Sequence, residues 1–347
     1  MDVRTVLITG GAGFYGESLK EYLLERGVRC VSVDVEEDFS RHPLLTSVRG
    51  DIRDRELLAR LAATHRFDAI CHLAAVLAHS VKDESHLWSV NVDGTRNVAE
   101  VAAEFSIPKV IFTSSNCLWG EGFGRPVSED DQPRPVEIYG RSKWEGEKIL
   151  LGSADRFDVV VLRCPTIVAA GRLGLLAILF EFIAEGRRVW VVDGGRNRYQ
   201  FISAADLNDA CLRALEYRGS DLFNIGSDNV PTLAEAYRYV IDRAGTKARV
   251  ASLPGRIALP LMRYAHRFGL SPLGPYQYKM IAESFEFDTA KIKARLGWSP
   301  SITNREMLWD AYRYYHDHLA EIKQRKNVSP HKKPASLGII RLLKWLS

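Results

Sequence analysis

The stretch VLITGGAGFYG, residues 6–16, joins a short apolar run to a set of closely spaced glycines. Gly11, Gly13 and Gly16 have the G-x-G-x-x-G spacing, and a helical pattern continues from Gly16. Between a strand and a helix, such glycines allow a tight turn and a close approach of the backbone to a pyrophosphate. The N–H groups and the positive dipole at the start of the helix favour the same ligand. The stretch therefore predicts a dinucleotide-binding fold, although glycines also form purely structural turns.

Around this stretch, short apolar runs alternate with helical patterns through the first half of the chain. The apolar runs are RTVLITG, RCVSVDV, DAICHLAA, KVIFTSS and DVVVLRC, which begin at residues 4, 29, 68, 109 and 158. Apolar strands that alternate with helices are typical of a parallel sheet covered on both faces. We therefore predict an α/β fold with a doubly wound parallel sheet of the Rossmann type.

The pattern changes after Pro165. Residues 173–186, LGLLAILFEFIAEG, have a helical pattern, and residues 187–195, RRVWVVDGG, have the pattern of a strand and a turn. The stretch SAADLNDACLRALEY, residues 203–217, predicts a helix that begins at a serine cap. Prolines, glycines and apolar residues mix in 251–275, which predicts irregular structure and a short helix over a pocket.

These patterns divide the chain into three parts. We predict an NAD-binding Rossmann domain over residues 1–165, to which residues 200–226 return. A smaller C-terminal α/β substrate-binding domain is predicted over residues 166–320. Residues 321–347 are predicted to form a basic linker and an amphipathic tail.

The composition is that of a water-soluble globular protein, with 46% hydrophobic and 26% charged residues among 347. No run of eighteen apolar residues predicts a transmembrane helix, and the N-terminus lacks the layout of a signal peptide. The cysteines are scattered and form no C-x-x-C pair, which predicts reduced thiols in a cytoplasmic protein and no metal site. They are Cys30, Cys71, Cys117, Cys164 and Cys211.

The charge is uneven along the chain. From Lys323 onward there are seven Lys and Arg residues and no Asp or Glu, so the rest of the chain is mildly acidic. An acidic body argues against nucleic acid as a partner. As a helix, the segment SLGIIRLLKWLS, residues 336–347, would have a broad apolar face and a cationic side. It could lie in a membrane interface, or it could dock on the protein's own body or on a second subunit.

Two aspartates that follow predicted strands are candidates for contacts with a dinucleotide. Asp34 ends the second predicted strand, eighteen residues after Gly16. A carboxylate there can bond both ribose hydroxyls of NAD and would repel the extra phosphate of NADP. Asp51, in GDIRD, could accept a hydrogen bond from the adenine amino group or could cap a helix.

The sequence YGRSK places Tyr139 and Lys143 four residues apart, on one face of a predicted helix. Tyrosine is ordinarily too weak an acid to be a base at neutral pH, because its pKa is about 10. A lysine ammonium and a positive nicotinamide close by would stabilise the phenolate. Tyr139 could then take the proton from a substrate hydroxyl. Ser115, at the carboxyl end of a strand, could bond the same oxygen.

The chain resembles the extended short-chain dehydrogenase/reductase family, in particular its NAD-dependent epimerase/dehydratase group, over residues 3 to about 315. The matching motifs are TGGAGFYG, GDIRD, HLAA, NVDGT, TSSNCLWG, YGRSK, VLRCP, FNIGS and FDTAKIKARLGW. The resemblance implies that Ser115, Tyr139 and Lys143 are catalytic and that Asn91 bonds backbone near the active site. From the residues alone, Asn91 could equally be a helix residue without a special role.

The resemblance also implies a set of NAD-binding residues that spans the first half of the chain. They are Gly10, Gly13, Phe14, Tyr15, Gly16, Asp34, Asp51, Ile52, Leu73, Ala74, Ala75, Asn91, Tyr139 and Lys143.

The chain departs from the family pattern at the predicted substrate site. Family dehydratases and decarboxylases have an acidic residue one or two places after the catalytic Ser or Thr, where this chain has Asn116 and Cys117. Thr166 stands where many nucleotide-sugar members have an asparagine that contacts the diphosphate. Arg198 matches the position of a family arginine that holds substrate phosphate, or is a surface charge beside Arg196. We therefore expect Asn116, Thr166 and Arg198 near the substrate and disfavour dehydratase activity.

Cys117 admits two interpretations. A few members of the family use a cysteine there as an acid/base that inverts a carbon beside a transient ketone, which requires a thiol of lowered pKa. A cysteine is also a small apolar filler of cores.

The sequence thus predicts an NAD-dependent oxidoreductase or epimerase that acts by hydride transfer at a secondary alcohol of a sugar-like substrate. The specific prediction is a nucleotide-sugar epimerase, and the predicted assembly is a homodimer. One alternative is a dehydrogenase or reductase of a non-nucleotide sugar or a lipid-like alcohol. Another is an NAD-binding sensor or scaffold without turnover.

Overall fold

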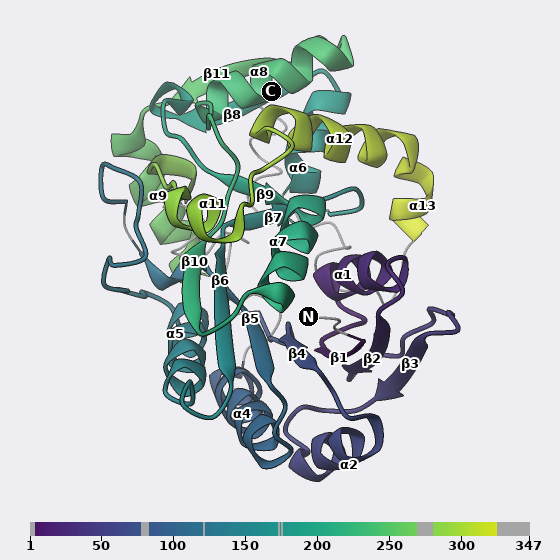
Figure 1. Ribbon diagram of the computed structural model, residues 1–347. Coiled ribbons are helices and arrows are strands. Elements are labelled where there is room, and N and C mark those ends of the chain that lie inside the picture. Colours follow the sequence, from purple (N-terminus) through teal and green to yellow (C-terminus); the bar gives the residue numbers. More distant parts are fainter. Residues whose placement is uncertain are drawn as a thin grey trace.

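The computed structural model describes residues 4–77, 83–120, 122–172, 174, 176–268 and 280–324. Its centre is a seven-stranded parallel sheet in the order β10-β6-β5-β4-β1-β2-β3, with helices on both faces (Figure 1). The predicted doubly wound parallel sheet is therefore confirmed. The strands are β1 (Thr5–Thr9), β2 (Arg29–Asp34), β3 (Leu45–Arg49), β4 (Ala69–His72), β5 (Lys109–Ser115), β6 (Asp158–Cys164) and β10 (Asp221–Asn224).

Each face of the sheet buries its own apolar core. One face packs against α1 (Phe14–Leu24) and α7 (Ala204–Glu216), whose inward side chains share a core with β1, β4 and β6. The other face packs against α2 (Arg55–His65), α4 (Gly94–Glu104) and α5 (Ile138–Leu151). The central strands are buried on both faces, which explains why their sequences are continuous apolar runs.

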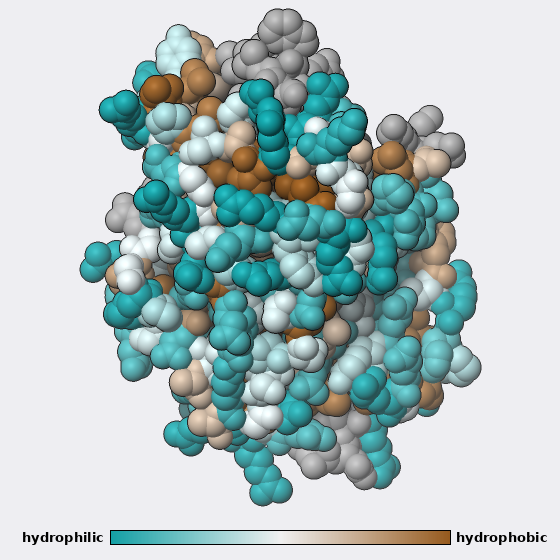
Figure 2. Space-filling view, turned by 90° about the horizontal axis from the view of Figure 1, so that it is seen from above, coloured by the Kyte–Doolittle hydropathy of each residue, from teal (hydrophilic) through white to brown (hydrophobic). Residues whose placement is uncertain are grey.

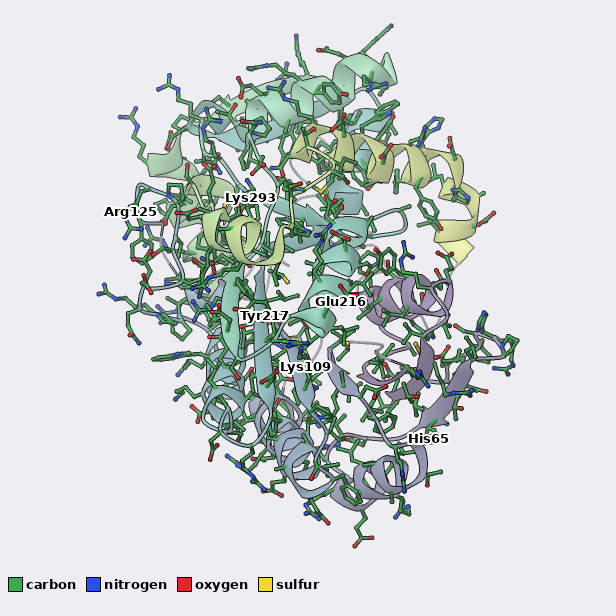
Figure 3. All side chains as sticks on the ribbon, viewed as in Figure 1. His65, Lys109, Arg125, Glu216, Tyr217 and Lys293 are labelled. Carbon is green, nitrogen blue, oxygen red and sulfur yellow. The ribbon has the colours of Figure 1, made fainter. Side chains whose placement is uncertain are left out.

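Chain segments far apart in sequence meet at β10. This strand follows α7 in the second half of the chain and pairs in parallel with β6, with Leu222 opposite Val161. Lys109, at the start of β5, is 3% exposed and donates from Nζ to the carbonyl oxygens of Leu215, at 3.1 Å, and of Tyr217. Figure 3 shows Lys109 reaching the end of α7 beside Tyr217. The buried ammonium therefore satisfies carbonyls at the C-terminus of α7 and ties that helix to the sheet.

Most of the remaining elements form the upper part of Figure 1 around a separate core, whereas α11 (Ala290–Leu296) packs through Ile292 on the core of β1, β4 and β6. Two small parallel sheets pair β7 with β9 and β8 with β11. Their strands are β7 (Thr166–Val168), β8 (Arg188–Val192), β9 (Phe201–Ser203) and β11 (Arg249–Leu253). The helices are α6 (Leu176–Ala184), α8 (Leu233–Ala244), α9 (Gly255–Arg267), α11 (Ala290–Leu296), α12 (Asn304–Asp317) and α13 (Leu319–Gln324). Two of these helices, α8 and α12, begin with complete capping boxes.

Of the irregular structure and short helix predicted over 251–275, the irregular start is wrong and the helix is present. Strand β11 extends to Leu253, and α9 runs for 13 residues from Gly255. Pro254 is the N-cap of α9, where a missing N–H costs nothing, and Pro260 lies inside the helix without ending it. Residues 269–275 lie outside the described residues, as does the predicted basic tail beyond Gln324.

The surface seen from above is mainly hydrophilic, with hydrophobic side chains in small separate patches (Figure 2). Within the described ranges, none of the helices combines the length and the apolar character that a bilayer span requires.

Candidate active site

The loop between β1 and α1 is shaped by glycines, and at Gly10 and Gly16 the neighbouring backbone leaves no room for a side chain. Gly10 has φ +75°, and a Cβ there would lie 2.7 Å from the backbone nitrogen of Ala74. A Cβ on Gly16 would lie 2.1 Å from the carbonyl oxygen of Gly10. Gly13 is the N-cap of α1 and offers no side chain to its first N–H groups. The bare backbone at a helix N-terminus fits a pyrophosphate, and this cradle therefore fits NAD.

Asp34 lies beside this loop at the carboxyl end of β2. Its Oδ2 accepts from the backbone N–H of Ala12 at 3.0 Å, and its Oδ1 accepts from that of Glu36 at 3.0 Å. Burial raises the pKa of the carboxyl, and the two backbone hydrogen bonds oppose that rise. Asp34 therefore has the position expected of a ribose-binding carboxylate.

Asp51 is not the cap of a helix. The cap of α2 is Asp54, whose side chain accepts from the backbone N–H of Leu57. The Asp51 carboxylate instead accepts from the guanidinium of Arg53 at 2.6 Å, and this bond lowers the pKa of Asp51. The helix-cap interpretation is therefore wrong, while the adenine contact stays a prediction. Ile52 is buried, and its side chain fills the space beside the α-carbon of Gly94.

The segment after β4 packs against the glycine loop. Leu73 donates its backbone N–H to the carbonyl of Thr9 at 3.1 Å, and Ala74 donates to Thr9 Oγ1 at 3.3 Å. The ring of His72, the last residue of β4, forms two hydrogen bonds. Its Nδ1 lies 2.7 Å from Thr9 Oγ1, and its Nε2 lies 2.8 Å from Thr95 Oγ1. Burial, with a smaller contribution from the charge of Lys143, lowers the pKa of His72 to about 3. The imidazole is therefore neutral and fixes this edge of the sheet.

Asn91 joins the segment after β4 to helix α5 by hydrogen bonds. It lies in a π-helical turn, Ser89–Asp93, that leads into α4. Its Oδ1 accepts from the backbone N–H of Val76 at 2.7 Å, and its Nδ2 donates to the Val76 carbonyl and to Ser142 Oγ, both at 3.0 Å. Ser142 in turn donates to the carbonyl of Tyr139 at 2.8 Å. Asn91 therefore helps to hold the first turn of α5 in position.

The three side chains predicted to be catalytic meet at the carboxyl ends of the strands. Tyr139 and Lys143 lie one turn apart on α5, and Ser115 ends β5. A hydrogen bond joins Ser115 to Tyr139. Lys143 is 3% exposed, and its Nζ lies 4.0 Å from the centroid of the Phe112 ring. Burial lowers the pKa of Lys143 to about 8, although the carboxylate of Glu147 one turn further along α5 opposes that shift.

Tyr139 is surrounded by groups that act on its pKa in opposite directions. Burial is the largest effect and raises the pKa, and a thiolate at Cys117 would raise it further. The positive charge of Arg172 and the hydrogen bond from Ser115 lower it. Arg172 is therefore one cation that acts on the phenol, and the sequence did not single it out.

Arg172 and Tyr199 are the residues of this site that sequence reasoning missed. The guanidinium carbon of Arg172 lies 5.5 Å from the centroid of the Phe14 ring, at the start of α1. Burial lowers the pKa of Arg172 to about 10, and the negative charges that Tyr199 and Tyr139 can carry oppose that shift. Tyr199 is 2% exposed and follows directly after Arg198, so its position next to a predicted substrate residue was the available signal.

The predicted substrate residues divide between two places. Asn116 is buried and donates from Nδ2 to Tyr199 Oη at 2.6 Å, and Thr166 Oγ1 lies 3.5 Å from the same hydroxyl. Asn116 adjoins Ser115 in the chain, and Thr166 shares its contact with Tyr199. Arg198 is exposed, and its guanidinium donates to the carbonyl of Val230. Arg198 thus makes its hydrogen bond within the second half of the chain.

Cys117 lies in the 3₁₀ turn Asn116–Leu118 that follows β5. Its backbone N–H donates to Ser115 Oγ at 3.1 Å. The side chain is half-buried, and its charge, when present, would raise the pKa values of Tyr139 and Lys143. The structure thus brings Cys117 beside the predicted catalytic residues and leaves both of its interpretations open.

A pocket of about 310 Å³ lies in the second half, close in sequence to Tyr199. Its lining residues are Val192, Asp193, Arg196, Asn197, Ala282 and Ser284. Asn197 is buried, and its Oδ1 has no hydrogen-bond partner. In the part of the chain that the structure describes, no group of three His, Cys, Asp or Glu residues could hold a metal ion.

Comparisons with known proteins agree with this geometry. A model of the NAD dependent epimerase/dehydratase family matches residues 6–226. A protein of Sinorhizobium fredii described as uncharacterized protein y4nG is 33% identical over 345 residues, which are 99% of this chain and 86% of that protein. The UDP-glucose 4-epimerase of Neisseria meningitidis serogroup C is 27% identical over 351 residues, covering 90% of this chain and 97% of that enzyme.

The fold is also that of a solved structure. The UDP-glucose 4-epimerase of Thermotoga maritima, solved with UDP-glucose, is similar with a TM-score of 0.75 and 23% identity. The similarity covers 91% of this chain and 99% of that one.

Proposed function

We propose that this chain, which belongs to the NAD-dependent epimerase/dehydratase family, inverts a secondary alcohol. The substrate would be sugar-like, and the inversion would proceed by hydride transfer. The observation that supports this proposal best is the meeting of Ser115, Tyr139 and Lys143 beside the glycine loop. A sensor or scaffold without turnover would not need a buried tyrosine, lysine and serine in this arrangement.

The residues that would hold NAD line one edge of the sheet. The glycine loop would bind the pyrophosphate, and Asp34 would bind the ribose hydroxyls. When bound, NAD accepts a hydride from the carbon that bears the substrate hydroxyl and can return it. Ala74 and Ala75 follow β4 at the same edge, next to the loop.

Tyr139 would move the proton of the substrate hydroxyl. Its Oη, oriented by the bond with Ser115, accepts that proton while Ser115 Oγ holds the same substrate oxygen. Because burial raises the pKa of Tyr139, the phenolate requires positive charge nearby. Arg172 supplies part of that charge, and Lys143, protonated below a pKa of about 8, lies one turn away on α5.

We propose a nucleotide sugar as the substrate, and a 4-epimerase as the specific activity, because two relatives that each align over 90% of the chain are UDP-glucose 4-epimerases. The test is a panel of UDP-sugars incubated without added NAD, with sugar epimers separated by chromatography. Conversion of one epimer into the other without a change in absorbance at 340 nm is the expected result. Steady accumulation of NADH with added NAD would instead indicate a dehydrogenase.

A second candidate is a dehydrogenase or reductase of a non-nucleotide sugar or a lipid-like alcohol. It is favoured by the position of Arg198, whose guanidinium bonds the Val230 carbonyl, and by Thr166, which lies by Tyr199. Each side chain already makes a contact within the protein. A panel of sugar acids and hydroxysteroid-like alcohols, followed at 340 nm, separates the two candidates.

Localisation and assembly are further proposals. All five cysteines are free thiols, which supports a cytoplasmic location. We propose a homodimer as the working assembly, and light scattering of the purified protein at micromolar concentration is the direct test.

A further inference from the structure

Helix α9 has its large apolar side chains on the outside. Its buried residues are small: Gly255, Ala258 and Ala265. By contrast, large side chains along it are more than half exposed: Ile257 at 61%, Leu261 at 58%, Tyr264 at 61% and, at the C-cap, Phe268 at 57%. An ordinary surface helix has the opposite arrangement, with its large apolar side chains facing the core.

The four exposed side chains form one continuous stripe. They are spaced by four, three and four residues, which places them on one side of an α-helix. The rings of Tyr264 and Phe268 touch, with centroids 4.5 Å apart. Only four other large hydrophobic side chains in the described ranges are exposed, and these are scattered over other elements: Val35, Phe39, Phe123 and Val136. A concentrated apolar stripe of this kind marks an interaction surface.

Positive charge runs along one flank of the apolar stripe. At about 100° per residue, Arg256, Arg263 and Arg267 fall roughly a quarter turn from the stripe, all on the same side. All three are exposed. No Asp or Glu occurs anywhere in residues 254–282, so no acidic residue of this segment offsets them.

We propose that α9 docks on an anionic lipid surface. The apolar stripe would enter the boundary between headgroups and acyl chains, and the three arginines would contact headgroup phosphates. Helices that bind this way combine a large apolar face, cationic flanks and low net hydrophobicity. The attachment would be peripheral, and it would be weakened by salt because part of it is electrostatic.

The charge also argues against the other occupants of this surface. The sequence beyond Gln324 is apolar and basic, with no acidic residue, so it would bring like charge against α9. A second copy of the chain docked α9 to α9 would do the same. Anionic lipid complements both the stripe and the arginines.

Helix α9 also connects to the substrate-binding half. The backbone N–H of Gly255 donates to Asp193 Oδ1 at 2.8 Å, and Asp193 lines the pocket of about 310 Å³. Leu261 and Tyr264 lie about 1.7 and 2.5 turns further along the helix, away from that junction. Variants at these two positions therefore test docking without altering the active site.

The test is co-sedimentation of the full-length protein with vesicles. Vesicles of phosphatidylcholine alone are compared with a 3:1 mixture of phosphatidylcholine and phosphatidylglycerol. We expect binding to the anionic vesicles only, and at least tenfold weaker binding by the double variant Leu261→Ser/Tyr264→Ser. Phe39→Ser, which removes an exposed ring elsewhere, is the matched control and should bind like the wild type.

The arginines are tested separately. Arg256→Gln/Arg263→Gln/Arg267→Gln should weaken binding to anionic vesicles and reduce its dependence on salt. Circular dichroism checks that each variant is folded. Failure of the wild type to bind, or equal binding by the Leu261/Tyr264 variant, would overturn the proposal. A variant that changes the oligomeric state in light scattering would show that the surface is an interface between copies.

Discussion

At the scale of single residues, the site depends on how a buried tyrosine can become a base. Burial raises the pKa of Tyr139, whereas the charge of Arg172 and the hydrogen bond from Ser115 lower it. Lys143 is buried too. Burial lowers its pKa to about 8, which is still above neutral pH, so the lysine stays mostly charged. The chemistry therefore depends on a few polar groups placed in an otherwise apolar setting.

Tyr139→Phe should abolish turnover while leaving NAD binding intact. The variant removes only the proton acceptor, and general-base catalysis of this kind contributes about 10²–10⁴-fold. Turnover is measured with the substrate that the panel identifies, and NAD binding is measured by calorimetry. Tyr239→Phe, on α8, is the control and should retain full activity. Turnover by Tyr139→Phe within threefold of wild type would reject the proposed base.

Tyr199→Phe should destabilise the fold because it leaves the buried Nδ2 of Asn116 without its acceptor. An unsatisfied buried donor costs about 1–3 kcal/mol, and urea unfolding measures that loss. The double variant Asn116→Ala/Tyr199→Phe removes both partners and should be less destabilised than the sum of the single variants. Strict additivity would mean that the two side chains do not interact.

Sequence pattern predicts some residues of this site and misses others for a physical reason. The glycine loop, Tyr139 and Lys143 have fixed local spacings, because one turn of helix or one strand-to-helix loop positions them. Tyr199 and Arg172 reach the site from the segments around β7 and β9, through tertiary packing alone. Such packing leaves no periodic trace in the sequence, and Arg198, the neighbour that did match a pattern, faces elsewhere.

At the scale of elements, α5 is held in register by a buried ion pair. Arg163 on β6 donates to Glu147 on α5 from Nε at 3.0 Å and from Nη2 at 2.7 Å, and both side chains are at most 5% exposed. Glu147 lies one turn after Lys143, so the same carboxylate fixes the helix and raises the pKa of the lysine. The arrangement couples the position of α5 to the charge at the site.

Glu147→Gln should move the alkaline limit of activity to lower pH. In the wild type, the charge of Lys143 is lost as pH rises through its pKa of about 8. Removing the carboxylate removes an effect that raises this pKa, so the lysine loses its proton at a lower pH. The pH profile of kcat/KM measures the shift. The fold should also lose stability, up to about 3–5 kcal/mol, because Arg163 keeps a buried charge with a weaker partner.

Glu145→Gln is the matched control for this variant. Glu145 is on the same helix, but it is more exposed and pairs with Lys148. Its loss should leave the pH profile and the unfolding midpoint nearly unchanged, since exposed pairs contribute little. A Glu147→Gln profile that overlays the wild type would show that this carboxylate does not act on Lys143.

The sequence predicts helices and strands best where their apolar side faces the core. The buried strands β1, β4, β5 and β6 are continuous apolar runs in the sequence, and each of the four is predicted. A short helix is predicted in the region of α9, but the sequence does not show that its apolar stripe faces outward. A periodic pattern indicates that a helix has an apolar face, and it does not indicate what covers that face.

At the scale of the whole molecule, the chain leaves the large sheet and returns to it. Helix α7 packs on α1, with Tyr15 Oη 3.1 Å from Cys211 Sγ, and β10 then pairs with β6. Phe223 of β10 is fully buried in the core that contains Leu19, Leu23 and Leu162. We propose on these grounds that residues 1–165 and 200–226 form one folding unit.

The proposal predicts that residues 1–165 do not fold alone. Without α7 and β10, the apolar side chains of α1 and β6 would be exposed to water, at a cost of about 25 cal/mol per Å² of apolar surface. The carbonyls at the end of α7 would also be missing as partners of the buried Lys109 ammonium. We expect the 1–165 fragment to lack a cooperative urea transition in far-ultraviolet circular dichroism, and a 1–226 fragment to recover part of it. If the 1–165 fragment unfolds cooperatively at the midpoint of the full chain, then α7 and β10 are additions to a unit that is already complete. The boundary of the nucleotide-binding domain would then lie at Pro165.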